Sequence, residues 1–427
     1  MRPGKPAFAL ILPACLVVLT CLPLTAQTYQ LKTITFAGYA GASQAELLAA
    51  SSLHAGQSVD QGGMNAAAQR LADTGLFANA QFKFDGEELH FDLTPVDDIV
   101  PARFENFAWW DDATLTSMLA ARVPLFKGSL PPGSAMQSRV IDELTALVSG
   151  QQVNAMVAAS TQQDPTTGKV TGVRFRITSP SIQVGAVTFE GASAGLSEQL
   201  EAGVAKAALG KDFSSEATPI SLAAATRTLY RNLGYLEVQT TQVSRRAPVL
   251  EGDAVRIPVT LTVQEGPQYR LDAIVLLKTV KGLEMPRTLP LKPGDVVNEG
   301  RLHQELSGIV APLKGKGYMH AHIEAVPKLN RVKQTAEYSL SVVPGDRYNM
   351  GGLEVQDLDD NLKALVLSAW GLKAGDPYNS DYVQNFLKNH PTLHQLDGYS
   401  ADFRQIEHLD THSVDLVISF RKGGPVS

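Results

Sequence analysis

The sequence predicts an α+β protein built from about five tandem copies of one small repeat, each with the element order strand, helix, helix, strand, strand. Three observations support this prediction. The same pattern of strands and helices recurs with a period of about 80 residues. A glycine separates the two helices of most repeats, and a second glycine ends the second helix just before an aromatic residue. Because each repeat would contact only its neighbours, we expect an elongated string.

The third repeat, residues 181–267, shows the pattern most clearly. Alternating apolar residues predict a first strand over 182–189. Leucine, valine and alanine at helical spacing then predict two helices, over 196–209 and 220–233, and a glycine directly follows each of them. Two further alternating segments predict the closing strands, over 235–243 and 255–263.

The other repeats follow the same order less regularly, with predicted bounds 28–96, 97–180, 268–346 and 347–423. The first should hold strands over 31–36, 80–84 and 89–93 and helices over 45–50 and 64–73. The fourth should hold strands over 269–277, 321–326 and 336–343 and a helix over 302–313. The fifth should hold strands over 348–355, 401–406 and 413–420 and helices over 362–370 and 381–388. The second is divergent, because Gln151 follows its Gly150.

The glycines after the second helices have a predicted structural role. A chain that leaves a helix and reverses into a strand needs a residue at positive φ, which glycine adopts without steric cost. This assigns four structural positions: Gly75, Gly234, Gly317 and Gly398. The tyrosines that follow the last three are expected to pack their rings under the helices. None of these glycines resembles a phosphate-binding loop.

The N-terminus predicts export from the cytoplasm. Arg2 and Lys5 precede an apolar run that ends in small residues, which is the order of a secretory signal peptide. We expect residues 1–26 to be removed by cleavage after Ala26, with lipidation at Cys21 as the alternative. The prolines in the run disfavour a membrane-spanning helix, and no later segment approaches transmembrane length, so the mature chain should lack a transmembrane segment.

Composition indicates a globular exported protein of several domains. Both cysteines, Cys15 and Cys21, lie in the predicted signal peptide, so no disulfide or thiol nucleophile is expected in the mature chain. The formal net charge of −6 gives no reason to expect a nucleic-acid partner. We predict no cofactor.

The polar residues do not assemble into a predicted catalytic or metal site. The histidine pairs are expected to be solvated or separated by turns: His320 with His322, His390 with His394, and His408 with His412. No Gly-x-Ser-x-Gly elbow occurs. Trp109 and Trp110 could form a sugar or peptide platform, although a buried ring beside a shielding one is the more common arrangement. We therefore predict a protein that is not an enzyme.

These motifs resemble those of a known family. Units of strand-helix-helix-strand-strand with Gly-Gln or Gly-Asp between the helices, Gly-Tyr after the second helix and Glu-Gly-Pro at the end are similar to polypeptide-transport-associated (POTRA) domains of the outer-membrane β-barrel assembly family. The resemblance covers nearly the whole mature chain. It implies that each repeat has two helices on one face of a three-stranded mixed sheet. Family members usually continue into a membrane barrel, which we do not expect after the fifth repeat here, because a barrel needs many more strands.

The resemblance also implies a function. The string would lie in the periplasm, associated with the outer membrane, and bind outer-membrane β-barrel proteins or subunits of the assembly machinery. The strand after the second helix would be an open edge that adds an extended segment by β-augmentation. This implies seven candidate edge residues: Tyr235, Leu236, Val238, Val243, Tyr318, Ile323 and Val326. Arg245 and Arg246 could steer an acidic partner, or form a solvated turn.

Two alternatives stay open. The string could be a spacer that docks onto a separate barrel or secretion channel without capturing clients. It could also be a periplasmic enzyme with a site between repeats, which a pocket with convergent acidic groups would indicate.

Overall fold

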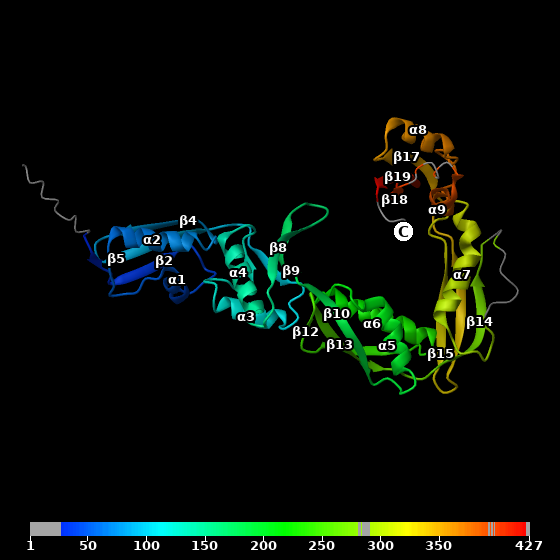
Figure 1. Cartoon of the computed structure of the whole chain (residues 1–427), viewed down its shortest axis with the longest axis horizontal. Helices are drawn as coiled ribbons and strands as arrows, with labels where there is room; N and C mark the ends of the chain where they lie inside the picture. The colour runs from blue at the N-terminus through cyan, green and yellow to red at the C-terminus, as the bar shows by residue number, and fades with distance from the viewer. Residues whose placement is uncertain are drawn as a thin grey trace, which may run out of the picture. The chain divides into compact units, whose positions relative to one another are not determined.

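The computed structural model describes residues 27–280, 283, 291–391, 393, 396 and 398–423 (Figure 1). The predicted signal peptide with Cys21, and also His394, lie outside the described residues. The chain divides into two compact parts, the first ending at Ile182 and the second beginning at Gln183.

The first part begins with a three-stranded sheet. Its strands are β2 (Thr33–Ala37), β5 (Glu88–Pro95) and β4 (Phe77–Phe84), in that order. The helices α1 (Gln44–Ser51) and α2 (Gln61–Ala72) lie between β2 and β4 in the chain, and the short strands β1 (Tyr29–Gln30) and β3 (Ser58–Val59) pair with each other. Leu47, Leu71 and Phe91 are completely buried between helices and sheet, which shows where the amphipathic faces meet.

A second sheet follows in the same part. Its order is β7 (Ser129–Leu130), β6 (Val100–Phe104), β9 (Val170–Ser179), β8 (Met156–Gln163). The helices α3 (Asp112–Ala120) and α4 (Ala135–Ser149) lie between β6 and β8 in the chain. Buried leucines of both helices and Phe175 of β9 form its core.

The second part starts with the sheet of the predicted third repeat. The strands β10 (Ser181–Glu190), β13 (Ala254–Gln264) and β11 (Gln239–Arg245) are neighbours in that order, and β12 (Val249–Glu251) also pairs with β13. The helices α5 (Ser197–Ala208) and α6 (Ala217–Asn232) separate β10 from β11 in the chain.

Two more sheets complete this part. One has the order β14 (Arg270–Lys278), β16 (Thr335–Val343), β15 (His322–Asn330), and α7 (Glu299–Lys314) is its one helix among the described residues. The other has the order β17 (Asn349–Gln356), β19 (Ser413–Lys422), β18 (Tyr399–His408), with α8 (Asp360–Ala369) and α9 (Ser380–Asn389).

Four sheets share one pairing pattern. In each of them the strand that comes last in the chain lies between two others. It runs parallel to the first strand of the sheet and antiparallel to the strand that precedes it in the chain, as in β17-β19-β18. The parallel pair requires a long crossover, which the helices supply, and the antiparallel pair requires only a hairpin. The predicted α+β class with small mixed sheets is confirmed. The division into five repeats with the stated bounds remains a prediction.

Two predicted strands begin later than the sequence pattern indicated. The strand expected over 235–243 begins at Gln239, and the one expected over 321–326 begins at His322 and continues to Asn330. The residues after the glycine first close the helix: the amide of Tyr235 donates to the carbonyl of Tyr230, at 3.0 Å, and that of Tyr318 to Leu313, at 3.2 Å. The chain needs this turn before it can extend, so the aromatic residue belongs to the helix end.

The four structural glycines all have positive φ: Gly75 (77°), Gly234 (87°), Gly317 (96°) and Gly398 (85°). Two of them also meet the start of the next sheet. The carbonyl of Gly234 accepts the amide of Tyr269, and that of Gly317 accepts the amide of Tyr348, both at 2.8 Å. A Cβ on Gly317 would lie 2.5 Å from the Tyr348 carbonyl oxygen, so the close approach itself requires glycine. Among the described residues, none of the helices has the length and apolarity needed to cross a bilayer.

Candidate polypeptide-binding edge and groove

The β15 strand presents a regular open edge. It pairs with β16 over nine consecutive residue pairs without a register shift, and no other described strand pairs with it. In an antiparallel pair, every second residue directs its N–H and C=O away from the partner strand. From His322 to Val326 these outward groups form a template onto which an extended chain can add, whereas Pro327 has no N–H to donate.

A groove follows this edge between β15 and α7. Its volume is about 610 Å³, and its walls come from both elements: His303, Leu306, Ser307, Val310, Lys314, Ala321, His322, Ile323, Glu324, Ala325 and Val326. Leu306, Val310 and Ile323 are buried and belong to the hydrophobic core of this sheet. The groove therefore has an apolar floor with polar groups along its rim, which suits an extended segment whose alternate side chains point inward.

A second cavity continues from one end of the groove toward α6. Its volume is about 510 Å³. It shares His303 and Ala325 with the groove, and its other walls are Arg227, Thr228, Arg231, Asn232, Glu299 and Gly300. The end of α6 and the start of α7 thus meet where the groove ends.

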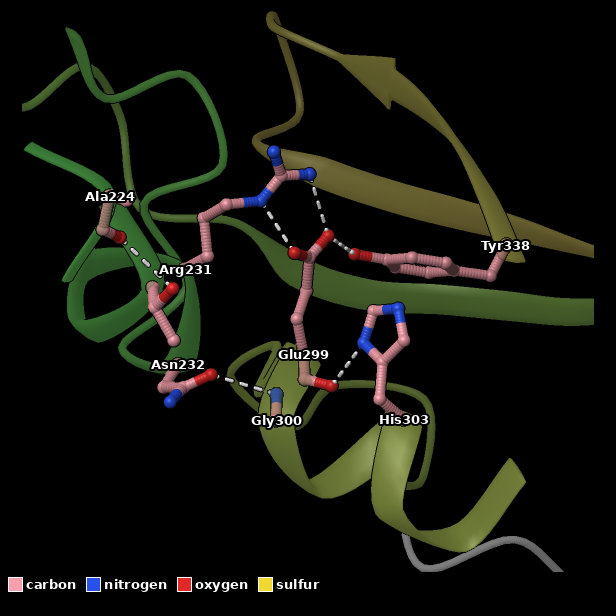
Figure 2. Close-up of polar contacts among 8 residues, drawn as sticks. Ala224, Arg231, Asn232, Glu299, Gly300, His303 and Tyr338 are labelled. Atoms are coloured by element: carbon pink, nitrogen blue, oxygen red, sulfur yellow. Dashed lines mark hydrogen bonds and ion pairs between the residues drawn. The ribbon is translucent and has the colours of Figure 1, made fainter. Parts of the chain in front are cut away.

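Glu299 is the centre of a polar network at this α6–α7 junction (Figure 2). Arg231 donates through Nε and Nη2 to the two carboxylate oxygens of Glu299, with 2.9 Å for the Nη2 contact, and the Tyr338 hydroxyl donates to Oε1 at 2.9 Å. Glu299 is only 8% exposed, so its charge needs these partners. Burial and then the Glu299 charge raise the pKa of Tyr338 far above its usual range, which keeps the hydroxyl a donor. Hydrogen bonding to Glu299 likewise raises the pKa of Arg231.

A residue of α6 also accepts a hydrogen bond from the backbone at the start of α7. Asn298, the N-cap of α7, accepts a hydrogen bond from the amide of Arg301 at 2.8 Å. The Asn232 side-chain oxygen accepts one from the amide of Gly300 at 2.7 Å (Figure 2). The first amides of a helix have no partner within the helix, so this contact satisfies one of them from the preceding helix. On the same turn, the Nδ1 atom of His303 lies 2.7 Å from the carbonyl oxygen of Glu299.

A second cluster connects the same two sheets. The Glu237 carboxylate, just before β11, accepts hydrogen bonds from Nε of Arg331 at 2.9 Å and from the hydroxyl of Tyr269 at 2.6 Å. The Arg331 bonds, and then the Tyr269 bond, lower the pKa of Glu237 below its usual value. The sheets of β11 and β15 are thus joined by two carboxylates, each held by one arginine and one tyrosine.

A similar groove lies beside β18, which is also an edge strand of its sheet. Its volume is about 330 Å³, and it lies between α9 and β18: Gln384, Leu387, Lys388, Leu393, Leu396, Tyr399, Ser400, Ala401, Asp402, Phe403 and Phe420. The combination of an open edge and an adjacent helix groove therefore occurs twice in the second part.

Of the seven predicted edge residues, three lie on edge strands and four precede them in the chain. Ile323 and Val326 lie on β15, where Ile323 is buried under α7 and Val326 is 61% exposed. Val243 lies on β11 and is half-buried. Four residues precede their strands instead of lying on them, and Leu236 and Val238 among these are buried: Tyr235, Leu236, Val238 and Tyr318. Whether any of them contacts a polypeptide remains a prediction.

Sequence reasoning missed the α6–α7 junction. Arg231 and Glu299 are 68 residues apart, and each has the appearance of an ordinary solvated charge near a helix end. Only the contact between two sheets brings them together. The sole signal in the sequence is an asparagine before Glu299 that is typical of a helix N-cap.

Two of the histidines singled out in the sequence contact carboxylates. His320 Nε2 lies 3.0 Å from the Glu407 carboxylate, and His408 Nε2 lies 2.9 Å from that of Asp415. In the part of the chain that the structure describes, no group of three or more potential metal ligands gathers. Trp109 and Trp110 are both partly buried, with ring centroids 5.9 Å apart.

No known family profile matches the chain. Over 200 residues it is 22% identical to a protein of Treponema pallidum (strain Nichols) described as "Putative outer membrane protein assembly factor". That match covers 46% of this chain and only 24% of the relative's length.

Solved POTRA structures are also similar. POTRA domains 3–5 of BamA from Haemophilus influenzae are 20% identical, with a TM-score of 0.45, over 57% of this chain and 98% of that one. POTRA domains 1–3 of the periplasmic domain of Omp85 from Anabaena are 14% identical, with a TM-score of 0.20, over 57% and 96%. The chain resembles POTRA-domain proteins. The resemblance drawn from the sequence is confirmed.

Proposed function

We propose that this protein is a non-catalytic periplasmic scaffold that captures extended polypeptides, or accessory subunits, by β-augmentation during outer-membrane protein assembly or transport. The observation that carries the proposal is the β15 edge, which is open and has beside it a groove lined by both apolar and polar side chains. Backbone hydrogen bonds supply affinity that depends little on sequence, and the groove selects alternate side chains. The name of the Treponema pallidum relative supports a role in assembly at the outer membrane.

The clients we propose are outer-membrane β-barrel proteins before they fold, or subunits of the machinery that assembles them. Segments of such proteins alternate apolar and polar residues along each strand. Alternation of this kind matches a site with backbone groups at one side and an apolar floor at the other.

A groove-filling substitution tests the proposal without disturbing the core. Ser307 is an exposed residue of α7 that lines the groove, so Ser307→Trp should obstruct it. Gly308 is the next residue, does not line the groove, and has no atom within 4 Å of an added Cβ, so Gly308→Trp is a matched control. We expect Ser307→Trp to lose most of the suppression of aggregation of an unfolded barrel protein, and Gly308→Trp to keep it.

The spacer hypothesis has an observation in its favour as well. The two carboxylate clusters at Glu299 and Glu237 join neighbouring sheets through side chains, which suits a component that sets a fixed distance. A spacer should co-purify with one barrel or channel and should not suppress aggregation. If neither tryptophan variant changes the aggregation assay because the wild-type protein has no effect in it, the client-binding proposal fails and the spacer stands.

A further inference from the structure

The α6–α7 junction contains a cation that its neighbours do not neutralise. Arg227 and Arg231 are four residues apart on α6, so they lie on the same side of the helix, and both line the junction cavity. Arg231 is paired with Glu299. Arg227 is exposed and has no hydrogen bond or ion pair with any of the described residues.

The only carboxylate lining this cavity cannot serve Arg227 as well. Both oxygens of Glu299 accept from Arg231, and one of them also accepts from Tyr338. Arg227 therefore has no counter-charge among the residues that line this cavity, and an additional anion would supply one. The cavity therefore offers a site of positive potential at one end of the groove.

The groove leads a bound segment directly to this cation. The groove is lined by Ala321 and by β15 from His322 to Val326, which corresponds to about 17 Å of extended chain. Its far end lies beside Lys314, and its near end is shared with the junction cavity through His303 and Ala325. A strand added to β15 that continues past Ala325 would reach the end of the groove that is shared with the cavity lined by Arg227.

We propose that the segment docked on β15 carries an acidic side chain that enters the junction cavity and pairs with Arg227. This inference rests on the proposed function, since it names the chemistry of the polypeptide that the edge would capture. The preferred partner is an extended segment with alternating apolar residues, followed by aspartate or glutamate. The preceding sheet, through α6, thus selects what the β15 edge binds.

Two synthetic peptides test this selectivity by fluorescence anisotropy on the whole mature chain. Each has about eight residues of alternating valine and threonine, and carries either aspartate or asparagine at both ends. We expect the aspartate peptide to bind about fivefold more tightly at low salt, a preference that shrinks as ionic strength rises. Arg227→Gln should remove the preference and leave the affinity for the asparagine peptide unchanged.

Matched substitutions separate the outcomes. Arg246 is an exposed arginine directly after β11 that lines neither cavity, so Arg246→Gln should keep the preference. Loss of the preference in Arg246→Gln, or its loss in Lys314→Gln with retention in Arg227→Gln, would overturn the assignment to Arg227.

The peptides also distinguish failure of the inference from failure of the proposed function. If both bind wild-type protein equally and Ser307→Trp blocks both, the edge captures polypeptides and the acidic preference is wrong. If neither binds, β-augmentation at β15 is itself wrong.

Discussion

The second part of the chain contains two sheet-to-sheet junctions that share a backbone contact and differ in their side chains. At both, the carbonyl of a positive-φ glycine accepts the amide of the first tyrosine of the next sheet, Gly234 with Tyr269 and Gly317 with Tyr348. At the α6–α7 junction, arginines then pair with Glu299 and Glu237. At the other junction, His320 pairs with Glu407.

The difference in burial matters more than the difference in residue type. Glu299 is 8% exposed, whereas the His320 side chain is 50% exposed. A buried carboxylate left without partners is costly, while an exposed pair contributes little. The shared backbone contact therefore recurs where neighbouring sheets meet, and the α6–α7 junction adds a buried carboxylate whose partners should matter for stability.

Removing the buried carboxylate should produce the largest effect. Glu299→Ala leaves the Tyr338 hydroxyl buried without an acceptor and Arg231 without its anion. We expect a loss of about 3 kcal/mol in the free energy of unfolding, measured by chemical denaturation. Glu407→Ala at the other junction is the control and should cost less than about 1 kcal/mol. Equal losses would mean that the two junctions do not differ in the way described.

The shared backbone contact predicts the next largest effect. Gly317→Ala combines a strained φ with a Cβ only 2.5 Å from the Tyr348 oxygen. We expect it to cost about 2 kcal/mol. Gly398 has a similar φ of 85° but nothing within 4 Å of an added Cβ, so Gly398→Ala should cost about 1 kcal/mol, the conformational penalty alone. Thermal unfolding of the two variants measures the difference, and a larger loss in Gly398→Ala would contradict it.

The pH dependence of the Glu237 cluster should be smaller but distinctive. Its folded pKa is lowered mainly by Arg331, so its contribution to stability is present above the unfolded value near 4.5 and is lost as pH falls through the folded pKa. Glu237→Gln should therefore be less stable than wild type at pH 7, with a gap of at most about 1 kcal/mol. The gap should close in strongly acidic solution. A gap that stays constant with pH would show that the carboxylate charge contributes nothing.

The smallest effect is expected at the histidine. His320→Ala removes an exposed contact with Glu407 and an edge-on contact with the Tyr348 ring. We expect a change within about 0.5 kcal/mol at pH 7. Urea denaturation of this variant beside Glu299→Ala would compare both junctions directly, and a loss near that of Glu299→Ala would reverse their ranking.

Local patterns predicted a large share of the fold. The alternation of apolar residues placed the middle strands well: β13 was expected over 255–263 and spans Ala254–Gln264, and β16 was expected over 336–343 and spans Thr335–Val343. Middle strands are buried on the helix side along their length, so period-two alternation identifies them. The edge strands β11 and β15 were predicted too early, because Tyr235 and Tyr318 close the preceding helices, whereas β4 and β18 begin before their predicted starts.

The candidate site was predicted only in part. The β15 edge was expected, and Ile323 and Val326 lie on it, but the neighbouring groove and its polar end were not. Single charges such as Arg227, Arg231 and Glu299 carry no local pattern that separates a buried ion pair from a solvated face. Their roles depend on which surfaces of two sheets come into contact.

By itself, the sequence determined the α+β class, the order of strands and helices, and the glycines at the helix ends, because these follow from side-chain periodicity and backbone sterics over a few residues. Tertiary structure alone decided that Arg231 neutralises Glu299 while Arg227 remains without a partner among the described residues, and that the groove beside β15 opens toward it. The physical reason is that electrostatic pairing and groove shape depend on contacts between segments about 70 residues apart, and such contacts form only when the sheets pack.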